Sequence, residues 1–406
     1  MIFLLSLRHG HSSAILFFVN DRSNFELMPA MAGKGYKFEH SAQILNNCPL
    51  WRARGIKVKD RQHFLDVLRV AATCAVVLLH TVTGVMDNTD MSLYPFEQKL
   101  FLTVRDLVCW CVPVFIIISG YLFLNPEREL TVKQMVFKYC RRVVLALFLF
   151  GVPYAWMELA AIEGHFQPQM LWQGVESVLQ WKTWSHMWYL YLIFFLYLLT
   201  PVIRWVLKRL PRGVVYALMA LLFVFCSILP FVGKFVSLPS ALSAVPGDCI
   251  YLFYYLYGYL FVCRKEWKKW LFPLFTGSAI ILAAGMAFSR IAGFSVQMAY
   301  NYPFTVLLAL CLFGAGLVRE RSHAIESGAE DAKKNTVLWE KAAQLCFAVY
   351  LIHPVFLNLF YKYFNITPLS FSIGISLPLF FLGTLVLSGV AAYILRIIPA
   401  LRQYVL

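Results

Sequence analysis

Residues 66–85, DVLRVAATCAVVLLHTVTGV, determine how the rest of the chain is interpreted. The stretch is apolar and has the length of about 20 residues that a helix needs to cross a membrane. Its only basic side chains are Arg69 and His80. Ionisable groups inside a membrane helix are costly and usually functional. Arg69 and His80 are therefore the first candidates for a functional site, and the alternative for His80 is a structural histidine packed between helices.

The spacing of these two residues places them on one face of the predicted helix. They are eleven residues apart, which returns to nearly the same azimuth, about 20° off, and separates them by about 16 Å along the axis. Asp66 lies three residues before Arg69, so an i,i+3 ion pair is predicted near the membrane boundary.

The composition indicates a polytopic membrane protein. Of the 406 residues, 60% are hydrophobic and the mean hydropathy is +0.67, whereas a soluble domain has roughly 45 to 50% apolar residues. The formal charge of +15 comes from short Lys and Arg clusters between apolar runs, which are typical of orientation signals. We therefore expect membrane lipid and not nucleic acid as the partner. The ten cysteines form no CxxC or Cys/His pattern, so we expect no metal.

Apolar runs predict an all-α bundle of about ten membrane helices. The runs lie at roughly 66–87, 100–124, 138–160, 184–203, 214–233, 248–263, 270–289, 301–318, 341–362 and 372–396. Alternate connections are rich in Lys and Arg, which predicts an even number of spans with both termini in the cytoplasm. The charged stretch 319–340 predicts a flexible cytoplasmic loop.

Residues 1–60 are expected to be an extension outside the membrane domain, which is predicted for residues 61–406. The apolar stretches of the extension are too short to span a membrane. It is interpreted as a poorly ordered segment, a signal peptide, or a misassigned start with initiation nearer Met28 or Met31. No second domain or internal repeat is predicted.

Small and basic residues in the second and third spans are further candidates. Lys138, Arg141 and Arg142 begin the third span as a basic group, which predicts either a phosphate site or a topology signal. Ser119 and Gly120 interrupt a run of β-branched and aromatic residues in the second span. Small residues there allow close helix approach or a local opening.

Four residues are candidates for contact with a substrate. His186 and Trp188 begin the fourth span near the outer boundary, where an aromatic belt also explains Trp188. Glu158 lies near the outer end of the third span and is either an ion-pair partner or part of an acceptor site. His353 precedes the kink-forming Pro354 in the ninth span, and it is either structural or lines the same cavity as His80.

Together these motifs resemble the acyltransferase 3 family of bacterial integral membrane acyltransferases, in particular the surface-polysaccharide O-acetyltransferases related to the enterobacterial common antigen enzyme. The resemblance runs from about Arg61 to the C-terminus. It is carried by Phe64 to Arg69 followed by ten residues and His80, by Phe115 to Leu122, by Trp188-Tyr189-Leu190, by Tyr257-Gly258 and by Tyr350 to Pro354. Lys138 stands where many members have Arg, and lysine would bind phosphate there as a point charge and not through a bidentate contact.

The resemblance implies transfer of an acetyl group from cytoplasmic acetyl-CoA, the cosubstrate, to a sugar hydroxyl on the outer side of a bacterial inner membrane. The acceptor would be a glycan or a lipid-linked saccharide. The residues expected to hold the donor are Arg69, Lys138, Arg141, Arg142, Ser119 and Gly120. His80, assisted by Arg69, would act as general base on the acceptor or would itself be acylated.

Two other functions remain open from the sequence. A transporter or lipid flippase would use Arg69, His80 and His353 to relay protons or bind a substrate, although no inverted repeat is present. A sensor would bind a ligand with the same fold and without chemistry. The sequence leaves the oligomeric state open.

Overall fold

The computed structural model describes residues 63–406 apart from 166, 240–245, 263–272, 274–275, 279, 282, 286, 288–298 and 327–331, and three strands before residue 31. The chain divides into two compact units, Met1–Arg61 and Gln62–Leu406. In the first unit, β1 (Phe3–His9), β2 (Ser12–Asn20) and β3 (Phe25–Ala30) form an antiparallel sheet in that order. The strands are not predicted from the sequence, and the interpretation of residues 1–60 as an extension stays a prediction.

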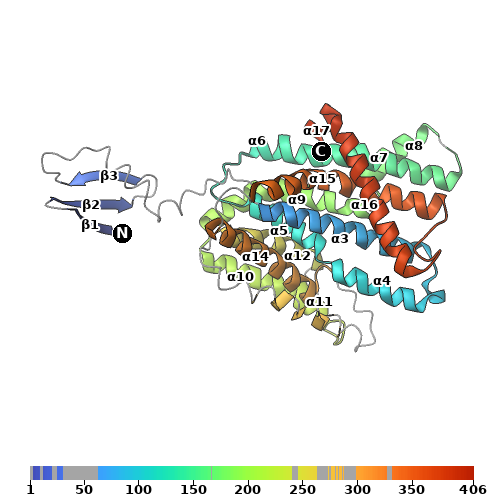
Figure 1. Ribbon diagram of the computed structural model, residues 1–406, viewed down its shortest axis with the longest axis horizontal. Coiled ribbons are helices and arrows are strands. Elements are labelled where there is room, and N and C mark those ends of the chain that lie inside the picture. Colours follow the sequence, from blue (N-terminus) through green and yellow to red (C-terminus); the bar gives the residue numbers. More distant parts are fainter. Residues whose placement is uncertain are drawn as a thin grey trace. The chain divides into compact units, whose positions relative to one another are not determined.

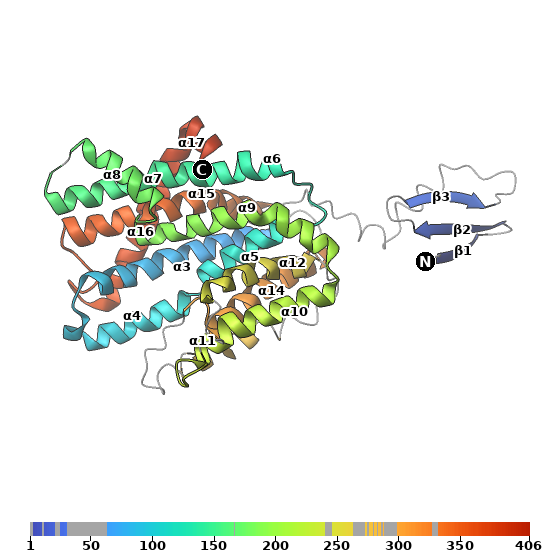
Figure 2. The same cartoon turned by 180° about the vertical axis from the view of Figure 1, so that it is seen from behind.

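The second unit is built from helices (Figures 1 and 2). In chain order they are α3 (His63–Asn88), α4 (Pro95–Val108), α5 (Cys111–Phe123), α6 (Val132–Gln134), α7 (Arg141–Glu163), α8 (Gln169–Leu179), α9 (Trp188–Arg209), α10 (Arg212–Phe223), α11 (Leu229–Val232), α12 (Ile250–Val262), α14 (Pro303–Glu326), α15 (Ala332–Asn358), α16 (Ile373–Ile397) and α17 (Pro399–Tyr404). Short π-helical segments, Met135–Cys140 and Leu359–Tyr363, precede α7 and follow α15.

The prediction of an all-α polytopic membrane bundle is confirmed. In the described part of the chain, seven helical segments are long and apolar enough to cross a membrane. They are His63–Asn88, Pro95–Phe123, Val132–Glu163, Ser185–Arg209, Arg212–Val232, Val337–Tyr363 and Ile373–Ile397. The other three predicted spans correspond to the short helix α12, to a region only partly described around Thr276–Gly285, and to the apolar part of α14, Pro303–Leu317. The total of ten stays a prediction.

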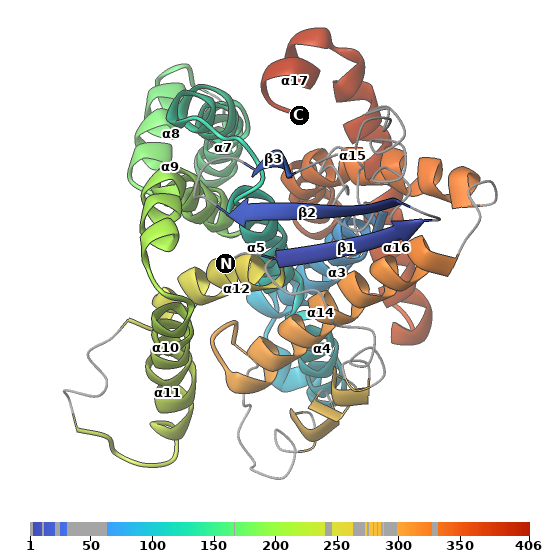
Figure 3. The ribbon, with the colours of Figure 1, turned by 90° about the vertical axis from the view of Figure 1, so that its left-hand side faces the viewer.

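Helix α3 lies among the other helices of the bundle, as the end-on view in Figure 3 shows. It packs against α4 and α5, which follow it directly in the chain, and against α14, α15 and α16 from the C-terminal half. Its buried face is mostly Ala, Val and Leu, with Phe64, Asp66, Thr73 and Thr81 among them. Of its ionisable groups, Asp66 is buried and Arg69 and His80 are half-buried, whereas Asp87 near the end of the helix is exposed. Functional ionisable groups in a membrane helix usually face the interior of the bundle.

Two glycines bring α5 and α12 into close contact. A Cβ atom on Gly120 would lie 1.9 Å from the carbonyl oxygen of Tyr255, and one on Gly258 would lie 2.3 Å from the main-chain nitrogen of Tyr121. Small residues permit such backbone contact between membrane helices. Gly120 does not interrupt its helix, whereas Pro113 lies in the first turn of α5, just after α4 ends. Proline is well tolerated in the first turn of a helix, where its missing N–H costs no helical hydrogen bond.

The prediction of a flexible loop over 319–340 is wrong for most of its length. Helix α14 continues to Glu326, and α15 begins at Ala332. The stretch is rich in Ala, Glu, Arg and Lys, which are good helix formers. The charge of this stretch therefore does not end either helix.

Candidate active site

Arg69 and His80 lie on a helix that is continuous over both residues. Because α3 is helical from His63 to Asn88, the two side chains share one face and are about 16 Å apart along the axis. Both face α9 and α15. Arg69 lies near enough to Tyr197 of α9 and Cys346 of α15 to interact with them electrostatically. The ring of His80 lies beside His353 of α15 and beside His186, which is in the helical turn Ser185–Met187 just before α9.

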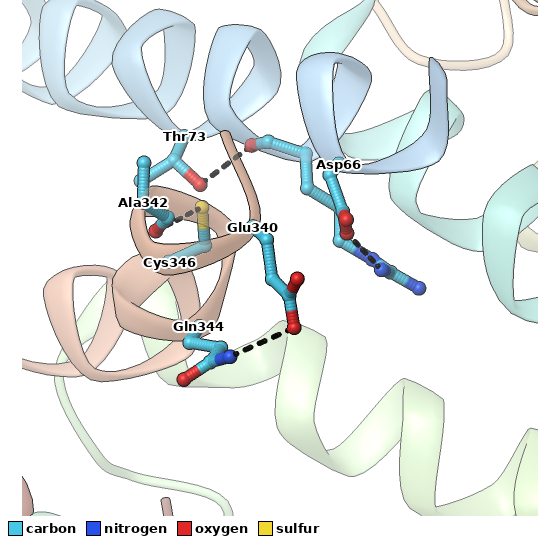
Figure 4. Close-up of polar contacts among 7 residues, drawn as sticks. Asp66, Thr73, Glu340, Ala342, Gln344 and Cys346 are labelled. Carbon is cyan, nitrogen blue, oxygen red and sulfur yellow. Dashed lines mark hydrogen bonds and ion pairs between the residues drawn. The ribbon is translucent and has the colours of Figure 1, made fainter. Parts of the chain in front are cut away.

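The predicted ion pair of Arg69 with Asp66 is confirmed. Arg69 Nη1 donates to Asp66 Oδ1 at 3.1 Å, and the Asp66 side chain is 2% exposed. The main-chain carbonyl of Arg69 accepts from the hydroxyl of Thr73 at 2.8 Å, and Thr73 lies beside Cys346 of α15 (Figure 4). The Arg69 side chain is 29% exposed. Guanidinium carries five N–H donors, so donors remain for a ligand that approaches this part of α3.

Three histidines from distant parts of the chain converge at the other end of this face. The ring centroid of His80 lies 5.1 Å from that of His353 and 6.3 Å from that of His186, and the latter two are 5.6 Å apart. His186 and His353 are buried, whereas His80 is half-buried. In the described residues no group of His, Cys, Asp and Glu side chains is arranged to hold a metal ion. That the protein needs no metal stays a prediction.

Tyrosine hydroxyls hold the segments that carry His186 and His353. The hydroxyl of Tyr350 donates to the main-chain carbonyl of His186, which ties α15 to the start of α9. The hydroxyl of Tyr154 donates to the carbonyl of Leu351 at 2.7 Å, which ties α7 to α15. The second bond is buried and the first is partly buried, and each fixes the relative position of two segments.

A cavity of about 390 Å³ lies beside His80, where α3, α7 and α15 end and α9 begins. It is lined by His80, Thr83, Gly84, Asp87, Asn88, Ala155, Glu158, Leu159, Ser177, Lys182, Thr183, Trp184, Ser185, His186, Pro354, Leu357, Asn358, Tyr361 and Lys362. Asp87, Asn88, Lys182 and Lys362 are exposed, while His186 and Tyr361 are buried. The cavity therefore leads from the protein surface to His80 and His186, whereas His353 lies behind its lining.

The charges around this cavity are balanced. Lys362 Nζ lies 3.0 and 3.2 Å from the two carboxylate oxygens of Glu158. The lining also contains one further acidic residue, Asp87, and one further basic residue, Lys182. Two buried ring atoms in the lining, Trp184 Nε1 and His186 Nε2, have no hydrogen-bond partner among the described residues. A polar ligand would be bound well there, since buried polar groups are normally hydrogen-bonded.

The basic residues at the start of α7 lie at the opposite end of the bundle from this cavity, next to the C-terminal segment. Arg142 Nε donates to the carbonyl of Val405 at 2.8 Å, and its guanidinium lies 5.5 Å from the Phe347 ring centroid. The Arg141 guanidinium lies 5.2 Å from the ring centroid of Tyr404. Lys138 lies in the π-helical segment, is exposed, and contacts the ring of the next residue. Arg142 and Arg69 both interact electrostatically with Tyr197, so Arg142 is the member of this group that approaches α3.

The structure separates the remaining predicted site residues. Ser119 lies within hydrogen-bonding reach of the phenols of Tyr189 and Tyr197 on the side of Arg69, whereas Gly120 is at the contact with α12. Glu158 and His186 line the cavity. Trp188 does not; its ring packs near Tyr251 and Tyr300.

Several residues of the cavity are missing from the sequence prediction, among them Asp87, Lys182, Trp184, Tyr361 and Lys362. The available signal is that Asp87, Lys182 and Lys362 are charges at the ends of apolar runs on one predicted side of the membrane. Trp184 directly precedes the Ser185-His186 pair and carries no signal of its own. Its ring stacks on Tyr154 with the ring centroids 4.3 Å apart, a contact between α7 and the segment that precedes α9.

Comparison with known protein families places these observations in context. Residues 62–397 match the acyltransferase domain of the acyltransferase 3 family. Neither curated proteins nor solved structures gave a match. The family match covers the whole membrane unit as far as Ile397 and favours an acyltransferase over the transporter and sensor alternatives. The chain belongs to the acyltransferase 3 family of membrane acyltransferases.

Proposed function

We propose that the protein transfers an acetyl group from cytoplasmic acetyl-CoA to a hydroxyl of a glycan or lipid-linked saccharide at the outer face of a bacterial inner membrane. The observation that carries this proposal is the position of His80. It lies in the wall of a polar cavity, and Arg69 lies on the same helix face about 16 Å away. One helix would thus connect a phosphate-binding group with a base.

The donor would lie along α3 on the side of α9 and α15. Arg69 and Arg142 both approach Tyr197 and would bind the phosphates of coenzyme A, because guanidinium offers donors matched to phosphate oxygens. The extended pantetheine arm is of the same order of length as the distance from Arg69 to His80. The thioester would then arrive beside the three histidines.

The acceptor would enter the cavity from its exposed end. A volume of about 390 Å³ falls within the range of about 300 to 1,000 Å³ of small-molecule sites. The lining contains hydroxyl, amide and charged groups. It also contains two ring nitrogens without a hydrogen-bond partner among the described residues, the donor Nε1 of Trp184 and Nε2 of His186. A polyhydroxylated ligand supplies both donors and acceptors, so a saccharide suits this lining better than an apolar or singly charged molecule.

The proposed reaction exchanges one bond for another. The acceptor hydroxyl oxygen bonds to the thioester carbonyl carbon, and the C–S bond of acetyl-CoA breaks. His80 takes the hydroxyl proton as the oxygen attacks and returns it to the departing thiolate. Imidazole suits this role because its ordinary pKa of about 6.5 leaves it neutral at working pH.

The proposal is tested with purified protein in nanodiscs, acetyl-CoA labelled in the acetyl group, and surface glycan from cells that lack the protein. We expect label to become ester-linked to the glycan, and mass spectrometry to find the same ester only in cells that contain the protein. Release of coenzyme A without any labelled glycan would contradict the proposed acceptor. Absence of both coenzyme A release and labelled glycan would contradict the proposed reaction.

A further inference from the structure

His353 makes the closest approach to His80 of the two neighbouring histidines. Their ring centroids are 5.1 Å apart, and the planes are inclined at 44°. His353 is fully buried on α15, whereas His80 lines the cavity. A buried imidazole next to a candidate base either fills space or acts on that base, and its hydrogen bonds distinguish the two.

The proline after His353 explains how its ring is held. Pro354 lies inside α15 and has no N–H, so the carbonyl of Tyr350, four residues earlier, loses its helical hydrogen bond. Nδ1 of His353 lies 2.8 Å from this carbonyl oxygen and 3.2 Å from that of Val349. Carbonyls only accept, so Nδ1 must carry a hydrogen. The His-Pro sequence therefore fixes both the ring orientation and the tautomer.

With Nδ1–H committed to the main chain, Nε2 of neutral His353 is an acceptor. It is buried and has no partner among the described residues. A buried polar atom without a partner is costly, and such atoms in native structures usually have a role. Among the described residues no carboxylate forms a hydrogen bond or ion pair with His353, so burial favours its neutral form.

We propose that His353 is a positioning residue whose Nε2 accepts a hydrogen bond from His80 while His80 holds the proton of the acceptor hydroxyl. This inference rests on the proposed function. One ring nitrogen of His80 takes the hydroxyl proton, and the N–H on its other ring nitrogen donates to Nε2 of His353. The proton then passes to the thiolate, and both rings return to their starting states. His353 itself gains and loses no proton.

Two substitutions separate this role from a purely structural one. In His353→Asn the side-chain amide nitrogen occupies the Nδ1 position and can still cap Tyr350, but nothing replaces Nε2. In His353→Gln the longer side chain offers its carbonyl oxygen near the Nε2 position. The measurement is coenzyme A release from acetyl-CoA by each purified protein in the presence of the glycan acceptor, with the melting temperature as the check on folding.

We expect His353→Asn to keep its melting temperature and its KM for acetyl-CoA, and to lose kcat by about 10- to 100-fold, the effect of one hydrogen bond to a charged group. His353→Gln should recover most of that loss. Full kcat in His353→Asn, or equal losses in both variants, would overturn the inference while an active wild-type protein leaves the proposed function intact. An inactive wild-type protein would overturn the proposed function and this inference with it.

Discussion

The contact between α5 and α12 makes a prediction that does not depend on function. In Gly258→Ala the new Cβ would lie 2.3 Å from the nitrogen of Tyr121 and 2.4 Å from the carbonyl oxygen of Ile117. Both are main-chain atoms of α5, so no side-chain rotation relieves the contact. To restore ordinary contact distances the helices must separate by about 1 Å. Protein interiors are close-packed, so this shift disturbs the packing around both helices.

The expected cost of Gly258→Ala is at the upper end of the roughly 1 to 3 kcal/mol found for overpacked sites. For a protein of this size we expect the melting temperature to fall by several degrees, at about 2 to 4 °C per kcal/mol. Gly120→Ala should behave alike, since its Cβ would lie 1.9 Å from the carbonyl oxygen of Tyr255.

Gly383 and Gly389 are matched controls, because both lie within the long helix α16 and a Cβ on either would meet no atom within 4 Å. The assay is heating of purified protein in detergent followed by size-exclusion chromatography of the fraction that stays folded. The control variants should melt at or above the wild-type temperature. If Gly258→Ala and Gly383→Ala melt alike, the backbone contact between α5 and α12 does not hold the bundle together.

Three further predictions concern the two ends of the proposed site. Arg142→Gln should raise the KM for acetyl-CoA about tenfold with little change in kcat. The control, Arg209→Gln, removes an exposed cation that lies over a tryptophan ring and should leave this KM unchanged. Equal KM values in the two variants would mean that Arg142 only contacts the C-terminal segment. Glu158→Gln should change the melting temperature little, because its ion-pair partner Lys362 is 38% exposed and such pairs stabilise by less than about 1 kcal/mol. The same substitution should raise the KM for the glycan. An unchanged KM would show that this ion pair takes no part in acceptor binding. Trp184→Phe keeps an aromatic ring and removes Nε1–H, so it should lower the rate of glycan acylation by about tenfold or more. The rate of coenzyme A release by hydrolysis, without glycan, should stay unchanged. Equal losses in both rates would argue against a contact of Trp184 with the acceptor.

Local features of the sequence predict local features of the structure. The Asp66–Arg69 pair follows from a spacing of three residues on a helix, and it is present. The shared face of Arg69 and His80 follows from helical periodicity alone, because α3 is continuous.

The convergence of the histidines could not be predicted in the same way. His186 and His353 are 167 residues apart in the chain, and their meeting with His80 depends on which helices neighbour α3. Hydropathy predicts that a helix lies in the membrane, but it does not predict its neighbours. Hydropathy also misplaced the end of α14 and the start of α15. Both helices extend through charged residues that are good helix formers.

The most direct test of the account compares two single substitutions in the purified protein, His80→Ala and His165→Ala. His165 is an exposed histidine outside the cavity, so its loss should leave activity unchanged. With folded amounts matched, we expect His80→Ala to lose acetyl transfer to the glycan by about 10² to 10⁴, the usual contribution of a general base. Transfer by His80→Ala at the rate of His165→Ala would contradict the claim that His80 carries the reaction.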